Sequence, residues 1–182
     1  MMGTKKICVF CGSQVGNKFF FEKSRSLGEE LALRGLTLIY GGGNQGLMGA
    51  VASGCREKSG DVIAVIPTFL SQVENAKNSQ CEKRVVKTLF ERKKEMLEIA
   101  DGFIALPGGI GTLDEITEVL ALLQLRQLTK PIGFLNLNGF YNPLFAMLRH
   151  FHENALTHHS LEKHMVISQE PKDLLDNLMR EI

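Results

Sequence analysis

Residues 106–115 read Leu-Pro-Gly-Gly-Ile-Gly-Thr-Leu-Asp-Glu, and they join a short apolar run to a helical pattern. The run before them, 102–106, has the length of a strand and a turn signal at each end. After them, apolar residues recur at helical spacing, at Leu113, Ile116, Val119, Leu120 and Leu123. A strand, a glycine-rich turn and a helix in this order present free backbone N–H groups to an anion. The stretch therefore predicts an anion site at the start of a helix.

Two interpretations of Thr112 and Glu115 are open at this point. Both residues are predicted on the first helical turn, where their side chains face whatever the glycine loop holds. The same Thr-x-x-Glu spacing also matches a capping box, in which the two side chains only satisfy backbone N–H groups. The spacing alone is compatible with a functional carboxylate and with a structural cap.

Strand-length apolar runs alternate with helical patterns along the chain. We predict strands at 6–10, 36–40, 61–66, 102–106, 131–135 and 165–167, with a brief one at 85–86. Predicted helices cover 20–34, 47–58, 89–100, the stretch after 112, 141–153, and a last segment that begins at Pro171. The segment 68–83 has no clear period and is predicted to be a loop or lid. This alternation predicts an α/β fold, a Rossmann-like doubly wound parallel sheet in a single domain over residues 1–182.

Three glycine-rich turns follow predicted strands, at 12–13, 41–46 and 108–111. In parallel sheets, ligands bind beyond the carboxyl ends of the strands. The Gly-x-Gly-x-x-Gly pattern of 41–46 matches a dinucleotide fingerprint, but the following strand ends in Val-Ile-Pro, without an acid for a ribose hydroxyl. No glycine loop leads into Lys-Ser or Lys-Thr, as a Walker-type loop would. The turns therefore predict one crevice for a phosphate-bearing ligand of mononucleotide size, assisted by Arg92 or Lys93.

Composition sets limits on the class of protein. The chain has 182 residues, of which 44% are hydrophobic and 23% charged, as is ordinary for a soluble globular protein. Its formal net charge of +1 gives no electrostatic argument for nucleic acid or an acidic membrane as a partner. Residues 1–6 lack the apolar segment of a signal peptide, and no apolar run approaches membrane-spanning length. We therefore expect a cytoplasmic protein.

The cysteines and histidines are not predicted to bind metal. Cys8 and Cys11 have the C-x-x-C spacing of a redox or zinc pair, but no second close pair or nearby histidine completes a zinc set. All four cysteines are predicted to be buried and reduced. The five histidines gather in the C-terminal third without accompanying carboxylates or cysteines, and we expect them to be exposed or to serve in packing.

Four stretches together resemble the LOG (Lonely Guy) family of cytokinin riboside 5′-monophosphate phosphoribohydrolases. They are Cys-Gly-Ser at 11–13, Tyr-Gly-Gly-Gly-Asn-Gln-Gly-Leu-Met-Gly at 40–49, Glu-Arg-Lys at 91–93, and Pro-Gly-Gly-Ile-Gly-Thr-Leu-Asp-Glu at 107–115. The similarity runs from Lys6 to the last helix. Sequences of this kind have often been labelled lysine decarboxylases, but the chain is short for such an enzyme and offers no convincing context for a pyridoxal Schiff-base lysine.

The resemblance implies hydrolysis of the N-glycosidic bond of a nucleoside 5′-monophosphate, AMP or an N6-substituted AMP, to free base and ribose 5-phosphate. By position, Arg92 and Glu115 match the catalytic residues of the family. The phosphate loop of the family matches Gly108, Gly109, Gly111 and Thr112. Its other nucleotide contacts match Ser13, Gly42, Gly43 and Lys93. Leu89 can pack on the base. The resemblance also implies a homodimer with sites near the subunit interface, and no metal or organic cofactor.

The chain departs from the family at positions that bear on the base. Leu89-Phe90 stands where the family usually has Met-His, Ala121-Leu122 replaces a Thr-Trp pair, and Arg126 replaces a glycine. Which base is released is therefore left open. The alternative is a non-catalytic protein of the same fold that binds a nucleotide or a phosphorylated cofactor, as molybdenum-cofactor carriers do; a pure binder has no chemical reason to keep Arg92 with Glu115.

Overall fold

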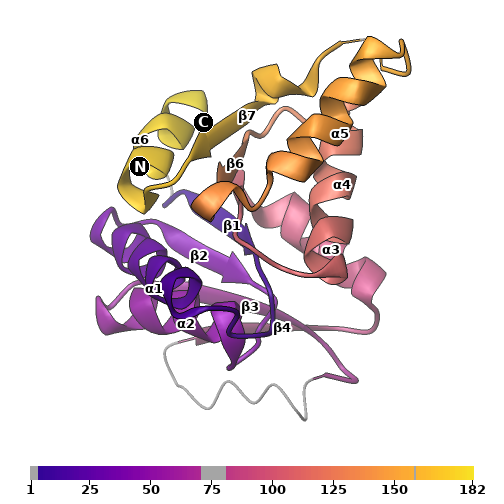
Figure 1. Ribbon diagram of the computed structural model, residues 1–182. Helices are drawn as coiled ribbons and strands as arrows, with labels where there is room; N and C mark the ends of the chain where they lie inside the picture. Colours follow the sequence, from indigo (N-terminus) through magenta and orange to yellow (C-terminus); the bar gives the residue numbers. More distant parts are fainter. Residues whose placement is uncertain (1–3, 71–80, 158) are drawn as a thin grey trace.

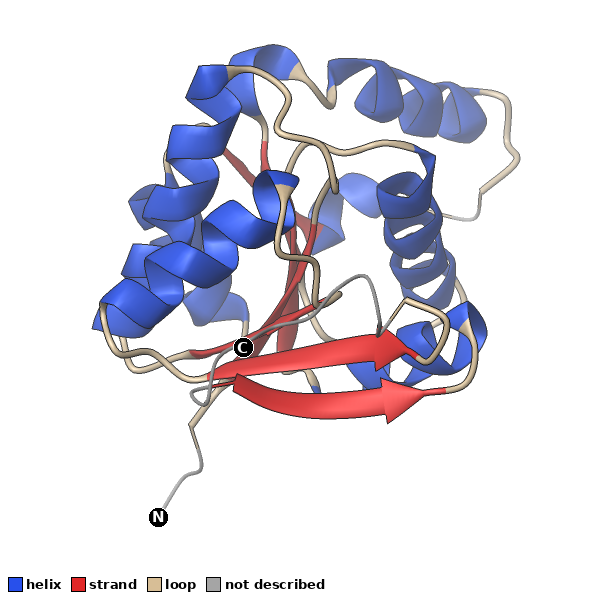
Figure 2. Cartoon of the chain, turned by 90° about the horizontal axis from the view of Figure 1, so that it is seen from below, coloured by secondary structure: helices blue, strands red, loops and turns tan. Residues whose placement is uncertain are grey.

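The computed structural model describes residues 4–70, 81–157 and 159–182, and these form one seven-stranded sheet between two layers of helices (Figures 1 and 2). The strand order is β4-β3-β2-β1-β5-β6-β7, and every neighbouring pair is parallel. The strands are β1 (Lys6–Phe10), β2 (Thr37–Tyr40), β3 (Val62–Pro67), β4 (Cys81–Val86), β5 (Gly102–Ala105), β6 (Ile132–Leu135) and β7 (Met165–Ser168). The predicted α/β fold with a doubly wound parallel sheet is confirmed.

Each face of the sheet is covered by three α-helices. On one face lie α1 (Lys18–Leu33), α2 (Gly46–Glu57) and α6 (Pro171–Glu181), and on the other α3 (Leu89–Ile99), α4 (Ile110–Gln124) and α5 (Asn142–Glu153) (Figure 1). Two short 3₁₀ turns, η1 (Leu137–Gly139) and η2 (Leu161–His164), lie in the connections around α5. Successive residues of β1 alternate between the layers: Ile7 and Val9 pack with α1 and α2, whereas Cys8 and Phe10 pack with α3 and α4. Such two-sided burial explains why the central strands are apolar throughout.

The strand order reverses between β1 and β5, which creates the binding edge of the sheet. The turns after β1, β2 and β5 meet there. The backbone N–H of Gly12 donates to the carbonyl of Pro107 at 3.1 Å, and that of Leu47 donates to the carbonyl of Gly12 at 3.1 Å. Gly46 has a positive φ of 61°, and a side chain there would collide with the backbone of Ser13. The three glycine turns are thus in direct contact, as the sequence predicted.

The segment 68–83 differs from its prediction as a loop. Residues 81–83 belong to β4, which the sequence limited to 85–86, and residues 71–80, where the proposed lid falls, lie outside the described residues. Among the described strands, β4 lies at the edge of the sheet beside β3, and it exposes much of its charged sequence. Its alternation is therefore too weak to be recognised in the sequence. Pro67, predicted to end the preceding strand, is instead the last residue of β3.

The cysteines largely follow their prediction. Cys8, Cys11 and Cys55 are buried and unpaired, whereas Cys81 is unpaired but only partly buried because it lies on the edge strand. His150, His152 and His164 are exposed, as expected, and His158 lies outside the described residues. Across the parts of the chain that the structure describes, no group of three or more His, Cys, Asp or Glu side chains is arranged to hold a metal ion.

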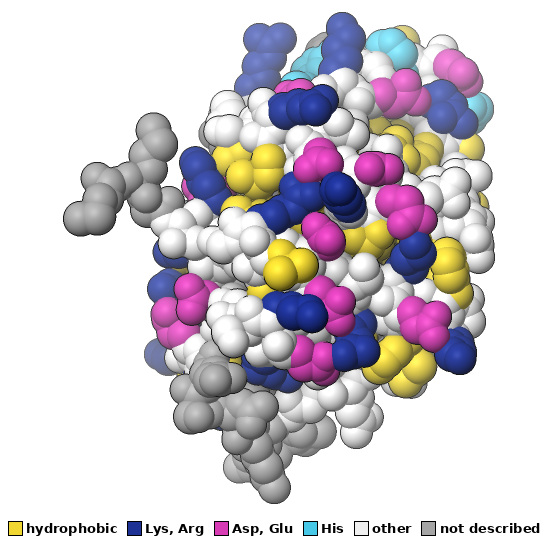
Figure 3. Space-filling model, turned by 90° about the vertical axis from the view of Figure 1, so that its left-hand side faces the viewer, with side chains coloured by type: hydrophobic (Ala, Val, Ile, Leu, Met, Phe, Trp, Pro, Cys, Tyr) yellow, Lys and Arg dark blue, Asp and Glu magenta, His cyan; other side chains and the backbone are white. Residues whose placement is uncertain are grey.

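Charged side chains are mixed by sign on the surface. The face drawn in Figure 3 shows Lys and Arg interspersed with Asp and Glu. Several of these charges form ion pairs along α1, such as Lys18 with Glu22 at 3.6 Å and Arg25 with Glu29 at 3.7 Å. None of the helices in the described ranges is both long and apolar enough to cross a membrane.

Candidate active site

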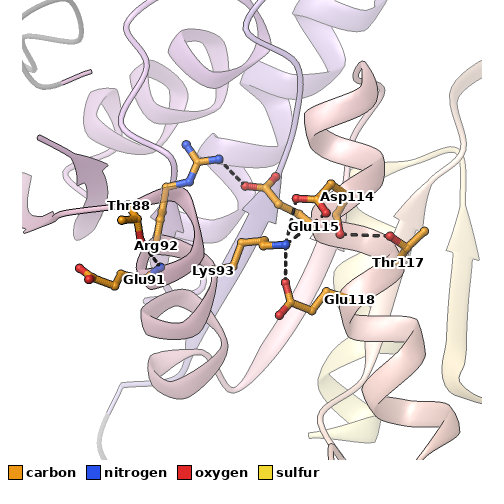
Figure 4. Close-up of polar contacts among 8 residues, drawn as sticks. All are labelled: Thr88, Glu91, Arg92, Lys93, Asp114, Glu115, Thr117 and Glu118. Carbon is orange, nitrogen blue, oxygen red and sulfur yellow. Dashed lines mark hydrogen bonds and ion pairs between the residues drawn. The ribbon is translucent and has the colours of Figure 1, made fainter. Parts of the chain in front are cut away.

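The two residues predicted to be catalytic form a buried ion pair across two helices. Nη2 of Arg92, on α3, lies 2.8 Å from Oε1 of Glu115, on α4 (Figure 4). Their side chains are only 12% and 8% exposed. A partly desolvated guanidinium–carboxylate pair is much stronger than a surface ion pair, because little water competes with it. The structure therefore brings together side chains that are 23 positions apart in the chain.

The start of α3 sets the direction of Arg92. Oγ1 of Thr88 accepts a hydrogen bond from the backbone N–H of Glu91 at 3.1 Å, and the carboxylate of Glu91 accepts one from the N–H of Lys87 at 2.8 Å. These two contacts satisfy donors that a helix start would otherwise leave open. They fix the first turn of α3 and so place Arg92 on the side that faces α4.

The capping-box interpretation of Thr112 and Glu115 is wrong. The N-cap of α4 is Gly109, which makes no side-chain capping bond, and the helix begins at Ile110 rather than after the motif. Thr112 lies on the first turn as predicted, but Glu115 lies on the second turn. The carboxylate of Glu115 is bound to Arg92 instead of to its own helix start.

Glu115 is poised to exchange a proton near neutral pH. Burial raises its pKa to about 7, and the positive charge of Arg92 opposes this rise without cancelling it. Asp114 raises the pKa further, and Lys93 lowers it. Burial is the largest of these effects, because the side chain is only 8% exposed and a single ion pair does not restore the hydration it has lost. A carboxyl group with a pKa near 7 in a ligand site is suited to acid–base chemistry.

The glycines at the start of α4 divide into structural and open positions. A side chain on Gly108 would collide with that of Thr112, so this glycine is required by packing. Side chains on Gly109 and Gly111 would meet nothing within 4 Å, although both positions lie beside the helix start. The first turn of α4 carries no acidic residue, and its N–H groups keep their partial positive charge. The open space over Gly109 and Gly111 can therefore admit an anion.

A cavity of about 330 Å³ lies beside this loop. Three predicted residues contribute to it: Ser13, Gly108 and Gly109. Gly12, from the predicted glycine turn at 12–13, also lines it. The remaining wall was not predicted; it consists of Gln14, Gly16, Phe20, Leu47, Pro107 and Phe140. The rings of Phe20 and Phe140 meet edge to face, with centroids 5.8 Å apart. No motif marks these two residues as part of a site, because Phe20 stands in a run of three phenylalanines that a helix can bury in the core. Only the position of Phe140 shortly beyond β6 hints at this edge of the sheet.

The turn after β2 lies next to Arg92. A side chain on Gly41 would lie 3.4 Å from Nη1 of Arg92, and one on Gly42, whose φ is 88°, would collide with Ile66. Gly43 is buried in the same turn. Nε of Arg92 is buried and has no hydrogen-bond partner in the described parts of the chain.

Leu89 and Lys93 flank Arg92 in different ways. Leu89 is 47% exposed and lies one turn before Arg92 on α3. Lys93 is largely buried, and its ammonium group is bound to Asp114 and Glu118. No sequence pattern singles out these two carboxylates, since each alone looks like an ordinary helix-surface charge.

Comparisons with known proteins agree with the resemblance seen in the sequence. Residues 48–178 match a family model described as "Possible lysine decarboxylase". A rice protein named probable cytokinin riboside 5′-monophosphate phosphoribohydrolase LOGL2 is 40% identical over 175 residues, which cover 96% of this chain and 72% of that protein. Arabidopsis thaliana cytokinin riboside 5′-monophosphate phosphoribohydrolase LOG4 is 39% identical over 174 residues, which cover 95% of this chain and 81% of that protein.

Solved structures show a similar fold at lower identity. The molybdenum cofactor binding protein of Rippkaea orientalis superposes with a TM-score of 0.76 at 23% identity, over 99% of this chain and 98% of that one. A Chlamydomonas Moco carrier protein superposes with a TM-score of 0.73 at 17% identity, over 98% of each chain. These two likenesses concern the fold alone. The family model and the two plant relatives establish that this chain belongs to the LOG family.

Proposed function

We propose that the chain hydrolyses the N-glycosidic bond of a nucleoside 5′-monophosphate, AMP or an N6-substituted AMP of the cytokinin riboside monophosphate type. The products are the free base and ribose 5-phosphate. The observation that carries this proposal is the buried Arg92–Glu115 pair beside the open glycine loop of α4. Relatives that are about 40% identical and are named for this reaction support it.

The chemistry of the bond explains the need for Glu115. As the bond between C1′ and the base breaks, positive charge builds on the ribose ring, and an ionised carboxylate nearby stabilises that charge. Water adds to C1′, and Glu115 orients it and takes one of its protons. The departing base gains one proton from solvent water, and Glu115 later returns its proton to solvent, so the reaction consumes one water in total. A carboxyl group with a pKa of about 7 can both be ionised and accept a proton near neutrality.

Arg92 has a different role, because a guanidinium does not act as a base near neutral pH. Its Nη2 group holds the carboxylate of Glu115 at 2.8 Å and favours the ionised form. Its Nη1 group, which lies beside the turn after β2, can bind a ribose or phosphate oxygen of the substrate. Arg92 thus fixes the sugar relative to Glu115.

We assign the remaining contacts by the part of the nucleotide that each environment suits. The 5′-phosphate lies over the start of α4, at Gly108, Gly109, Gly111 and Thr112, with the hydroxyl of Ser13 opposite. Gly42 and Gly43, in the turn next to Arg92, approach the ribose, and the exposed side chain of Leu89 packs on the base. Binding the phosphate away from the reacting bond holds C1′ against Glu115. None of these steps calls on a metal or an organic cofactor.

We further propose a homodimer and a cytoplasmic location. Leu120 and Leu123 of α4 are buried within the protomer, whereas Leu125 at the end of this helix is 67% exposed. Phe90 and Ile110, exposed beside the site, add to the surface that a second copy can cover. Unpaired cysteines fit a reducing compartment. Light scattering coupled to size-exclusion chromatography measures the mass in solution, and a mass of one chain contradicts the dimer.

The test of the reaction is chromatography of the purified chain incubated with a panel of nucleoside 5′-monophosphates. We expect the wild type to release free base from AMP or its N6-substituted forms, and Glu115→Gln to release none while remaining folded. Glu98→Gln is the matched control, because Glu98 lies exposed on α3 and its carboxylate pairs with Lys94 on the same helix. A folded wild type that binds AMP and releases no base from any nucleotide would instead favour the non-catalytic binding protein.

A further inference from the structure

Lys93 lies between two carboxylates of the neighbouring helix (Figure 4). Its Nζ is 2.8 Å from Oε2 of Glu118 and 3.0 Å from Oδ2 of Asp114. The side chain of Lys93 is only 17% exposed. We refer to Lys93, Asp114 and Glu118 as the Lys93 cluster. It joins α3 to α4 directly beside the Arg92–Glu115 pair. Lys93 follows Arg92 in the sequence, and Asp114 precedes Glu115, so the two sets of contacts lie next to each other.

The Lys93 cluster leaves little for a substrate to bind. The positive charge of Lys93 faces two negative charges of the protein, and Glu118, with help from Asp114, raises the pKa of the ammonium group so that it stays protonated. A phosphate that used Lys93 as a ligand would have to displace at least one of these carboxylates. The open N–H groups at the start of α4, by contrast, have no such competitors in that helix turn.

We propose that Lys93 is a positioning residue for the reaction, which Asp114 and Glu118 hold in place so that it fixes α3 against α4 and tunes the charge around Glu115. This inference rests on the proposed function, in which Glu115 acts as an ionised carboxylate. It assigns a role to two acidic residues, Asp114 and Glu118, that are not among the nucleotide contacts proposed above. Networks of several charges hold their geometry better than isolated surface pairs.

The electrostatic part of the proposal follows from the groups that surround Glu115. Those with charge or titratable protons are Arg92 and Lys93 on α3, Asp114 on its own helix, Cys8 and Cys11 at β1, and Tyr141 before α5. Burial raises the pKa of both thiols and of the phenol, so these three remain neutral. Among the residues that the structure describes, Arg92, Lys93 and Asp114 therefore act as the charges on Glu115. Lys93 lowers the pKa of Glu115, and Asp114 raises it.

Two substitutions separate this role from mere packing, because they are expected to act in opposite directions. Lys93→Met removes a positive charge and leaves Asp114 unbalanced, so the pKa of Glu115 rises and the acid limb of kcat/KM moves to higher pH. Asp114→Asn removes a negative charge, so the acid limb moves to lower pH. The carboxyl carbon of Glu115, identified by its loss in Glu115→Gln, reports the same shifts by ¹³C NMR without any substrate.

A double-mutant cycle tests the link between Lys93 and Glu118. We expect Lys93→Met and Glu118→Gln each to lower kcat, by about tenfold for Lys93→Met, and the double variant to be no worse than Lys93→Met alone. Lys94→Met is the control, since Lys94 is exposed on the same helix and pairs loosely with Glu98 at 3.8 Å. It should leave both kcat and the acid limb unchanged.

The outcomes distinguish this inference from the proposed function. Suppose that Lys93→Met raises KM for AMP and leaves the pKa of Glu115 unchanged, and that the effects of Lys93→Met and Glu118→Gln on kcat are additive. Lys93 is then a substrate ligand, and the inference is overturned. If the wild type releases no base at all, the proposed function fails instead, and the NMR shifts alone then decide whether the Lys93 cluster controls Glu115.

Discussion

The carboxyl group of Glu115 is the side chain on which the proposed reaction depends, and its ionisation can be followed through the rate. Because the ionised form is needed to stabilise charge on the ribose, we predict that kcat/KM rises with pH through about 7, the pKa that burial gives this group. Initial rates of base release at saturating and limiting nucleotide across this range give the profile. Activity that is constant across pH 7 would show that Glu115 does not act as a base or a charged stabiliser.

The guanidinium of Arg92 is expected to be irreplaceable by another cation. Lysine keeps the charge but not the planar fork that holds Glu115 with Nη2 and places Nη1 beside the turn after β2, so Arg92→Lys should lower kcat by about a hundredfold or more. Arg84→Lys is the matched control: Arg84 also pairs with glutamates, at 2.7 Å to Glu82 and 2.6 Å to Glu95, but on the edge strand. Equal activity of Arg92→Lys and wild type would remove Arg92 from the mechanism.

The first turn of α4 allows binding to be separated from folding. At Gly111, inside the helix, an added methyl group meets nothing, and alanine is a better helix former than glycine by about 1 kcal/mol. We therefore predict that Gly111→Ala melts at or above the wild-type temperature yet binds AMP at least about tenfold more weakly, because the methyl group projects into the phosphate subsite. Calorimetry and equilibrium binding measure the two effects.

Gly108→Ala supplies the contrast. Its methyl group would collide with the side chain of Thr112, so this variant should lose stability as well as binding. If Gly111→Ala binds AMP as tightly as the wild type, the phosphate does not lie over the start of α4, and the assignment of the loop is wrong.

Individual helices and strands could be predicted where their pattern is strong. The buried strands β1, β2, β3, β5 and β6 were recognised because both of their faces are apolar. The edge strand β4 was missed over 81–83, since an exposed, charged strand lacks that pattern. The spacing of Thr112 and Glu115 suggested a side-chain cap at the start of α4, which the structure does not have. Side-chain capping bonds are found instead at the start of α3, where Thr88 and Glu91 accept backbone hydrogen bonds. Local spacing does not reveal which of two matching motifs a helix start uses.

Because Glu115 is buried, the free energy of unfolding of the whole molecule should depend on pH. The pKa of this group is about 7 in the fold and 4.5 in its ordinary state, so the folded protein binds a proton that the unfolded chain releases. The resulting stabilisation is complete below about pH 4.5 and is lost as the pH rises through about 7. It amounts to about 3 kcal/mol. Glu115→Gln, which cannot titrate, should lack this loss.

Urea unfolding of both proteins at several pH values between 4.5 and 8 provides the comparison. The difference between the two free energies of unfolding isolates Glu115, because all other groups titrate in both proteins. A wild type whose stability relative to Glu115→Gln increases over this range would mean that the carboxyl group has a lowered pKa, and that the ion pair with Arg92 outweighs burial.

Parts of the site that follow from the parallel sheet could be predicted from the sequence, whereas parts that depend on contacts between distant segments could not. The three glycine turns could be placed together because parallel strands end at one edge, and the Arg92–Glu115 pair followed from the family resemblance. The walls of the cavity could not be predicted, since Phe20 and Phe140 come from segments 120 residues apart with no motif of their own. The Lys93 cluster was likewise hidden, because its contacts exist only once α3 lies against α4.

The central claim is that the Arg92–Glu115 pair breaks the bond between base and ribose. The most direct measurement is the simultaneous quantification of adenine and ribose 5-phosphate formed from AMP by the wild type and by Glu115→Gln, with AMP binding measured for both. We predict equal amounts of the two products from the wild type, and none from a variant that still binds AMP. Base release by Glu115→Gln at the wild-type rate, or release of phosphate in place of base, would contradict this account.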